Sequence, residues 1–193
     1  MFEISEASLF HYINDLSGQN PYIDAVMVAL SHSHTWILCA LAALVTAWRA
    51  NNPRLAATLI CALMALGVSD LISFEVVKPI VARERPCWTL PDVKNILGRC
   101  GGSYGFTSNH AANAFAAWFF VGAFYGFRSG ASLLALWIAT AVGISRVYLG
   151  VHYVGDIAGG ALLGVAIAAA MNALGLRRLG NFLAAKLIKT GDR

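Results

Sequence analysis

The chain has 193 residues, of which 58% are hydrophobic and 12% are charged, and its formal net charge at pH 7 is +4. A soluble domain usually carries about 25% charged residues, and the mean hydropathy here is +0.64. These values exclude an ordinary soluble domain and predict a protein embedded in a bilayer. Nucleic acid is not expected as a partner, because the basic residues lie beside apolar segments and form no continuous run.

Five apolar segments have nearly the length that a membrane-spanning helix needs. They lie at about residues 24–48, 55–77, 111–127, 132–149 and 154–174, and a span requires roughly 20 mostly apolar residues. Two further segments, 5–17 and 176–188, mix apolar and polar residues and are expected to lie as short helices in the membrane interface. The pattern predicts an all-α fold: an integral membrane helical bundle of about five transmembrane helices, with residues 1–193 forming one domain.

One long polar connection, residues 78–109, stands out among otherwise short loops. Long loops between regular elements are often functional. Cys87 and Cys100 flank the polar part of this loop and are candidate partners for a disulfide, provided that the loop faces an oxidising compartment. The other two cysteines, Cys39 and Cys61, lie inside apolar segments and are expected only to pack.

Basic residues are distributed unequally between the two sides of the predicted bundle. The side that holds the C-terminus carries Arg49, Arg54, Arg128, Arg177, Arg178, Lys186, Lys189 and Arg193. The opposite side carries fewer, namely Lys78, Arg83, Arg85, Lys94, Arg99 and Arg146. An excess of Lys and Arg marks the cytoplasmic side. The long loop is therefore expected to face outward, toward the periplasm of a bacterial inner (cytoplasmic) membrane.

Three polar clusters lie on this outward side, at the ends of segments that are far apart in sequence. The first contains Lys78, Arg85 and Pro86, just after the second apolar segment. The second is the run from Thr107 through Ser108 and Asn109 to His110, and the third comprises Ser145, Arg146, His152 and Asp156. Because alternating spans bring all three clusters to one face of the bilayer, we expect them to form a single site.

The residue types in these clusters suit a phosphoryl group. Lys78, Arg85 and Arg146 supply positive charge and hydrogen-bond donors for its negatively charged oxygens. Ser108 adds a donor at a helix N-terminus, which is a natural anion site. No grouping of Asp, Glu, His or Cys has clear metal-ligand spacing, so the cations are expected to take the place of a metal, and no cofactor is expected.

Two histidines and one carboxylate could carry out the chemistry. His152 and Asp156 are four residues apart and share a face if a helix begins there. A carboxylate in that position can hold one imidazole nitrogen protonated and leave the other free to attack phosphorus. His110 is then available to protonate the departing oxygen. A single histidine near a span end is more often interfacial, and we apply that interpretation to His11, His32 and His34.

The three clusters resemble the signature of the type-2 phosphatidic acid phosphatase superfamily, which reads K-x6-R-P, then P-S-G-H, then S-R-x5-H-x3-D. The first and third parts match at every fixed position, and the middle part departs with Thr107 for Pro and Asn109 for Gly. The resemblance covers about residues 70–160. It implies a membrane lipid phosphatase with a phosphohistidine intermediate on His152, oriented by Asp156, with His110 as the acid. It also implies phosphate binding by Lys78, Arg85, Ser108, Asn109 and Arg146.

The substrate is less well defined by the sequence. An outward-facing site suits the recycling of a polyprenyl carrier in a bacterial envelope, so undecaprenyl diphosphate is the first expectation. Phosphatidylglycerophosphate, phosphatidic acid and the lipid A phosphates are alternatives. A non-enzymatic protein that binds or transports a phospholipid through the same cations is a further alternative, although such a protein would not need His110, His152 and Asp156 together.

Other polar and small residues have structural interpretations. Asp70 and Glu75 lie in the second apolar segment, where exposure to lipid would be costly. Glu75 precedes Lys78 by about one helical turn and is expected to pair with it, whereas Asp70 is expected to hydrogen-bond a neighbouring helix or to support the site. The glycines of the last segment are expected to permit close helix packing; they are Gly155, Gly159, Gly160 and Gly164.

Overall fold

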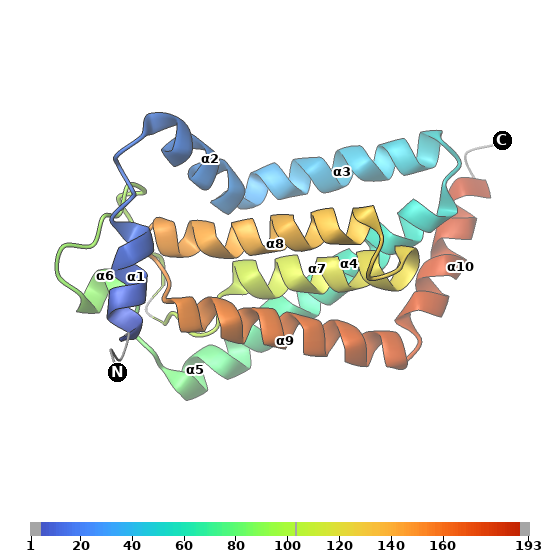
Figure 1. Ribbon diagram of the computed structural model, residues 1–193. Coiled ribbons are helices and arrows are strands. Elements are labelled where there is room, and N and C mark those ends of the chain that lie inside the picture. Colours follow the sequence, from blue (N-terminus) through green and yellow to red (C-terminus); the bar gives the residue numbers. More distant parts are fainter. Residues whose placement is uncertain (1–4, 103, 190–193) are drawn as a thin grey trace.

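The computed structural model describes residues 5–102 and 104–189, and the described part is a bundle of helices (Figure 1). The long helices run roughly side by side, and shorter ones close the two ends. In chain order the elements are α1 Glu6–Asn14, α2 Pro21–Ser31, α3 Ser33–Arg49, α4 Pro53–Ile72, the π-helical turn η1 Ser73–Val77, α5 Lys78–Val81, α6 Pro86–Thr89, α7 Asn109–Tyr125, α8 Gly130–Tyr148, α9 Val154–Ala173 and α10 Leu176–Lys189. The predicted all-α membrane fold is confirmed.

Polar residues cap most of the long helices at their N-termini. The side chain of Asn52 accepts a hydrogen bond from the Leu55 amide, and Pro53 follows as the first helical residue. Ser129 accepts from the Ser132 amide in the same way at the start of α8. Such caps satisfy amides that have no partner within the helix. They fix the points at which the chain enters the bundle.

Helix α7 lies at the centre, between α4, α8 and α9 (Figure 1). Small residues allow this arrangement, because Gly164 of α9 faces the backbone carbonyl of Ala112 and a Cβ at Gly164 would collide with it. A Cβ at Gly160 would likewise collide with the carbonyl of Ser108, the residue that caps the start of α7. Close packing through these two glycines is therefore confirmed, and it sets the start of α9 against the start of α7.

Within the described residues, three helical stretches are long and apolar enough to cross a bilayer: Pro53–Val81, Gly130–Tyr148 and Val154–Ala173. The pair α2 and α3 meets the same criteria together, but the two helices are bent by 64° at a break around His32. The expectation of one continuous span over residues 24–48 is thus wrong. Helix α7 has 17 residues and is slightly short for a span, so the number five remains a prediction.

Segments 5–17 and 176–188 contain helices, as expected. These helices, α1 and α10, also pack onto the bundle. Phe10 and Asn14 of α1 are fully buried against the ends of α8 and α9. Asn14 is well satisfied there, since its amide donates to the carbonyls of Lys94 and Tyr148 and accepts from the Lys94 amide. At the opposite end α10 packs on α4, with Gly180 against Cys61. Figure 1 shows α1, α5 and α6 at one end of the bundle and α10 at the other.

Candidate functional site

The three polar clusters converge at the α1 end of the bundle around one cavity of about 520 Å³. The cavity is lined by residues from each cluster, together with Phe74, Pro79 and Tyr104. From the predicted site it contains Lys78, Arg85, Asn109, His110, Arg146 and His152. Backbone hydrogen bonds join the clusters, since the Ser108 amide donates to the Asp156 carbonyl at 3.0 Å and the Gly105 amide donates to the Arg83 carbonyl at 2.7 Å.

His152 and Asp156 have the geometry expected of an oriented nucleophile. His152 Nδ1 lies 3.3 Å from Asp156 Oδ2, and the same oxygen accepts the Tyr153 amide at 2.9 Å. His152 Nε2 lies 3.0 Å from Arg85 Nη1. Because a guanidinium can only donate, Nε2 must be the acceptor and Nδ1 must carry the proton. The unprotonated nitrogen therefore faces the cavity.

The surroundings of His152 keep its imidazole neutral. Only 2% of the residue is exposed. Burial, with help from the positive charges of Arg85, Arg146 and Lys78, holds the pKa of His152 well below its usual value of 6.5. A neutral imidazole retains the lone pair that nucleophilic attack requires.

Lys78 is directed toward the site by a local change in helix geometry. The π-helical turn Ser73–Val77 adds a residue to the turn between α4 and α5, and such insertions often occur at functional sites. Lys78 is 7% exposed, and its Nζ donates to the carbonyls of Thr107, Tyr104 and Gly105 at 2.7, 3.3 and 3.4 Å. Glu75 remains exposed at the cavity mouth, and no ion pair with Lys78 is found among the described residues. The expected Glu75–Lys78 pair is therefore wrong.

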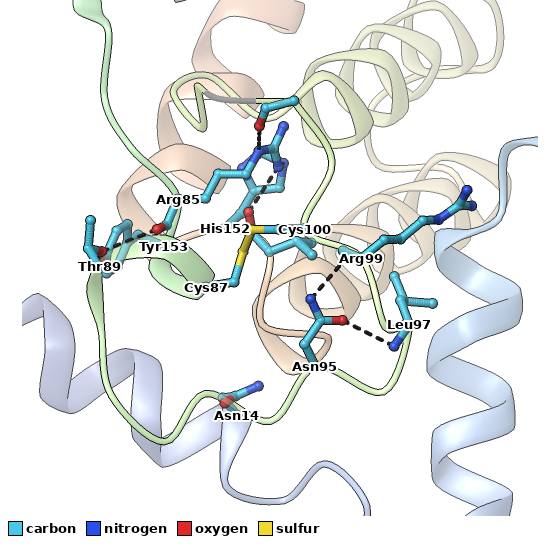
Figure 2. The surroundings of a disulfide bond; sticks show 12 residues. Asn14, Arg85, Cys87, Thr89, Asn95, Leu97, Arg99, Cys100, His152 and Tyr153 are labelled. Carbon is cyan, nitrogen blue, oxygen red and sulfur yellow. Dashed lines mark hydrogen bonds between the residues drawn. A yellow bond between two sulfur atoms is a disulfide. The ribbon is translucent and has the colours of Figure 1, made fainter.

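Arg85 lines the cavity, and its side chain lies next to His152 (Figure 2). Its Nε donates to the Gly102 carbonyl at 2.6 Å, and its Nη1 donates to the Val151 carbonyl at 2.9 Å. These two carbonyls come from the long loop and from the α8–α9 connection. Arg85 thus holds the first and third clusters together, and its charge faces the nucleophilic nitrogen.

The long loop is closed by a disulfide between Cys87 and Cys100, whose Cα atoms are 6.1 Å apart (Figure 2). Cys87 comes two residues after Arg85, and Cys100 comes two residues before Gly102, the acceptor of Arg85. The disulfide therefore lies directly beside the part of the loop that positions this guanidinium. Cys61 is free and buried, and Cys39 is free and exposed.

The two departures in the middle cluster are explained by contacts with α4. Asn109 donates to Asp70 Oδ1 at 2.8 Å and accepts from Ser73 Oγ at 2.8 Å. The Thr107 hydroxyl lies 3.0 Å from the same Ser73 Oγ. Asp70 also accepts from Asn113 at 3.0 Å, so the expectation that Asp70 hydrogen-bonds a neighbouring helix is confirmed. Thr107 and Asn109 thus anchor the start of α7 to the end of α4 and the start of η1.

Ser108 has a more structural position than expected. It is fully buried, and its hydroxyl caps α7 by accepting from the Ala111 amide at 3.5 Å. It does not line the cavity, whereas Asn109 does. The first amides of α7 still begin beside the cations, and the partial positive charge of a helix N-terminus favours an anion there.

His110 and Arg146 meet Ser31 at the end of α2. His110 Nε2 lies 3.0 Å from the Ser31 carbonyl, so this nitrogen carries a proton. Arg146 Nη1 donates to the Ser31 hydroxyl, whereas its Nε is buried without a partner. The end of α2 therefore forms one wall of the site, which the sequence did not indicate.

Arg83 and Glu6 complete a chain of charges behind the nucleophile. Arg83 Nη1 donates to Asp156 Oδ1 at 3.2 Å, and its Nη2 pairs with Glu6 Oε2 on α1. The other oxygen of Glu6 accepts the Gly155 amide at 3.0 Å. Sequence reasoning counted Arg83 only as one of the basic residues on its side. Its spacing, two residues before Arg85, was the one available signal.

Within residues 5–102 and 104–189, no group of three His, Cys, Asp or Glu side chains could hold a metal ion. Independence from metals remains a prediction, which removal of metals can test directly.

Comparison with known proteins decides the family. Residues 56–179 match the PAP2 superfamily, and this range contains all three clusters. The chain belongs to the PAP2 superfamily. It is 31% identical over 168 residues to "Lipid A 4'-phosphatase" of Porphyromonas gingivalis, covering 84% of this chain and 69% of that one. It is 30% identical to "Bacitracin transport permease protein BcrC" of Bacillus licheniformis, covering 81% of this chain and 73% of that one.

Solved structures of PAP2 proteins share the fold. The crystal structure of a transmembrane PAP2-type phosphatidylglycerolphosphate phosphatase from Bacillus subtilis is similar with a TM-score of 0.63 and 25% identity. The match covers 87% of this chain and 85% of that one. Aquifex aeolicus LpxE is similar in fold, with a TM-score of 0.56 and 18% identity over 85% of this chain and 92% of that one. The prediction that the protein is a membrane lipid phosphatase is therefore confirmed.

Proposed function

We propose that this PAP2 protein removes the terminal phosphate of a membrane lipid phosphate or diphosphate through a phosphohistidine on His152. The observation that carries the proposal is the orientation of His152: Nδ1 is held by Asp156, and the unprotonated Nε2, which accepts from Arg85, faces a cavity lined by three cations. Fixed positive charge at such a point stabilises the transferring phosphoryl group. Lys78, Arg85, Arg146 and the Asn109 amide bind its oxygens in this scheme, with Ser108 holding the helix start in place.

The proposed reaction has two steps. His152 Nε2 forms a bond to phosphorus while the bond from phosphorus to the leaving oxygen breaks. In this scheme His110 begins the step protonated on both ring nitrogens, gives one proton to that oxygen and becomes neutral. Water then attacks the phosphohistidine, which releases inorganic phosphate and restores the free imidazole. His110, now lacking the proton it gave up, can take one from this water.

The role of His110 has a direct test in the dependence of rate on the leaving group. His110→Ala should slow phosphate release severely from a lipid monophosphate, whose leaving alkoxide is a strong base. The loss should be smaller for a diphosphate, whose leaving phosphate needs less help from an acid. Equal losses with leaving groups of different pKa would argue against His110 as the acid.

The substrate proposal is undecaprenyl diphosphate, on the basis of an outward-facing site in a bacterial inner membrane. That orientation rests on the excess of Lys and Arg at the α10 end of the bundle. The names of the relatives support alternatives, namely lipid A phosphates and phosphatidylglycerophosphate; phosphatidic acid is a further one. All share a terminal phosphate at the membrane surface, which the cavity accommodates.

A binding or transport protein is the alternative from another class. Cations alone would hold a phosphate group, and such a protein would not need an imidazole oriented by a buried carboxylate. Asp156 is completely buried, and burying a carboxylate costs free energy unless it is paired. Its contacts with His152 and Arg83 therefore favour a catalytic use.

The test is phosphate release by the purified protein in detergent, with excess EDTA throughout. Undecaprenyl diphosphate, phosphatidylglycerophosphate, phosphatidic acid and lipid A are compared as substrates. We expect turnover with at least one of them, greatest for the diphosphate, and none with His152→Ala. Binding without phosphate release would support the transport alternative, and activity that needs added Mg²⁺ would contradict the metal-free mechanism.

A further inference from the structure

A second cavity, of about 300 Å³, lies next to the catalytic cavity. The two cavities share the side chains of His110 and Arg146, whereas His152 lines only the first. Ser31, Arg99, Cys100 and Val151 contribute to the second cavity, together with His32, His34 and the apolar residues Val28 and Leu97.

The positions of His152 and His110 relate the second cavity to the leaving group of the reaction. In phosphoryl transfer the attacking and leaving groups lie roughly in line across phosphorus. His152, the nucleophile, is on the side of the first cavity, and the protonated Nε2 of His110 points toward Ser31, which lines the second. Because His110 lines both cavities, a leaving oxygen that receives its proton lies where the two cavities meet, and the group bonded to that oxygen can enter the second cavity.

The polar lining of the second cavity suits an anion. Arg99 and Arg146 are fixed cations, and His32 and His34 can each donate an N–H bond. Arg146 contributes a guanidinium whose Nε is buried without a partner. No Asp or Glu lines this cavity, so nothing there offsets the positive charge.

The polar groups that line this cavity come from two parts of the fold, and the side chains of Arg99, His32 and His34 are exposed. Arg99 adjoins the disulfide at Cys100, and its carbonyl accepts from Asn95 at 3.0 Å, while its side chain extends away from that turn (Figure 2). On the opposite wall, the break between α2 and α3 places His32 and His34 together, with ring centroids 5.1 Å apart. In a straight helix through residues 31–34, the rings of His32 and His34 would not both line the same cavity as Ser31 at the end of α2.

From these observations we infer that the second cavity binds the leaving group as a phosphate, with Arg99, His32 and His34 as its ligands. The substrate class is then a lipid diphosphate: the terminal phosphate occupies the first cavity, and the phosphate bonded to the lipid occupies the second. This inference rests on the proposed phosphatase function and narrows its substrate. A lipid monophosphate would leave the second cavity without an anion.

The test compares farnesyl diphosphate with farnesyl phosphate, which have the same tail and differ only in the second phosphate. Arg99→Gln and the double variant His32→Gln with His34→Gln are assayed beside wild type in detergent. We expect kcat/KM for farnesyl diphosphate to fall at least about tenfold, as for loss of a charge-assisted hydrogen bond. For farnesyl phosphate the change should stay below about twofold. Lys94→Gln is the matched control, because it removes a cation from the same loop but lies outside both cavities.

Equal proportional losses for both substrates, or no loss for the diphosphate, would overturn the inference. If wild type hydrolysed neither lipid, the proposed function would fail, and binding would still test the second cavity. Calorimetry with inorganic pyrophosphate and phosphate serves that purpose. Tighter binding of pyrophosphate that Arg99→Gln removes supports a second phosphate site, and equal affinity for the two anions contradicts it.

Discussion

His152 illustrates how a buried histidine is prepared for attack without a metal. Its proton is held on Nδ1 by Asp156, and the opposite nitrogen faces Arg85. The same cations that would bind the phosphate also oppose protonation of the ring. Charge in this site therefore acts twice, once on the substrate and once on the nucleophile.

This environment predicts the low-pH side of the activity profile. Because the pKa of His152 lies well below 6.5, the ring stays neutral as pH falls through that value. We expect kcat at saturating substrate to remain on its plateau at pH 6.5 and to fall only at lower pH. The linkage has the corresponding sign for stability: the unfolded chain takes up a proton below about pH 6.5 and the folded chain does not, so acid favours unfolding. A midpoint of the acid limb at or above 6.5 would contradict this assignment.

Arg83 and Glu6 are predicted to position the nucleophile through Asp156. Arg83→Ala should lower kcat by about tenfold, the lower end of the range for groups that orient a catalytic ligand, and change KM little. Glu6→Gln keeps an oxygen for the Gly155 amide but loses the charge, so its effect should be smaller. Arg83→Lys should restore only part of kcat, since lysine lacks the planar fork that reaches both carboxylates.

The control for this pair is Asp15→Asn, which removes a carboxylate at the end of α1 that makes no contact with Arg83 or Asp156. It should leave kcat unchanged. A purely structural role for Arg83 would appear as a lower unfolding temperature with unchanged kcat in the remaining folded enzyme.

At the scale of elements, the long loop depends on its disulfide. Replacing Cys87 and Cys100 together by Ser removes a cross-link across a sequence separation of 13 residues, which the chain-entropy model values at about 3 kcal/mol. We expect a lower unfolding temperature in detergent and a lower kcat/KM, because the loop carries Gly102, an acceptor of Arg85. Cys39→Ser, at an exposed free cysteine, should change neither. Thiol labelling of Cys87 and Cys100 without prior reduction would show that the bond is absent.

The sequence predicted some elements well because their signals are local. The ends of α8 and α9 agree with the expected segments within about two residues, since a long apolar run with a polar cap defines such a helix. The break at His32 was missed, because the residues on both sides are apolar enough to continue one span. Its position depends on contacts of Ser31 with His110 and Arg146, more than 75 residues away in sequence.

In the candidate site, too, local patterns were predicted from the sequence and tertiary contacts were not. Spacing brought His152 and Asp156 together, and alternating spans placed the clusters on one side. The partners of Asn109 and Thr107 on α4, and of Asp156 through Arg83 to Glu6, could not be read from the sequence. These contacts are tertiary, and each joins groups whose separation in sequence gives no indication of proximity.

For the whole molecule, the distribution of charge predicts sidedness. On the loop side, Lys78, Arg85 and Arg146 line the catalytic cavity, Arg99 lines the second, and Arg83 pairs with Glu6 and Asp156. Most cations on the loop side are thus explained by the site. The basic residues at the other end have no such explanation, and their excess therefore indicates which side faces the cytoplasm. A reporter that is active only in the cytoplasm should give a signal when fused to the C-terminus. A signal from a reporter active only outside would overturn this orientation.

The most direct test of the account is to locate phosphate on the enzyme during turnover. Wild-type protein is mixed with lipid diphosphate in EDTA, quenched under alkaline conditions that preserve phosphohistidine, digested and analysed by mass spectrometry. We expect a phosphoryl group on the peptide that contains His152, assigned to that residue by fragmentation and absent from His152→Ala. Phosphate on a different residue, or turnover by His152→Ala at the wild-type rate, would contradict it.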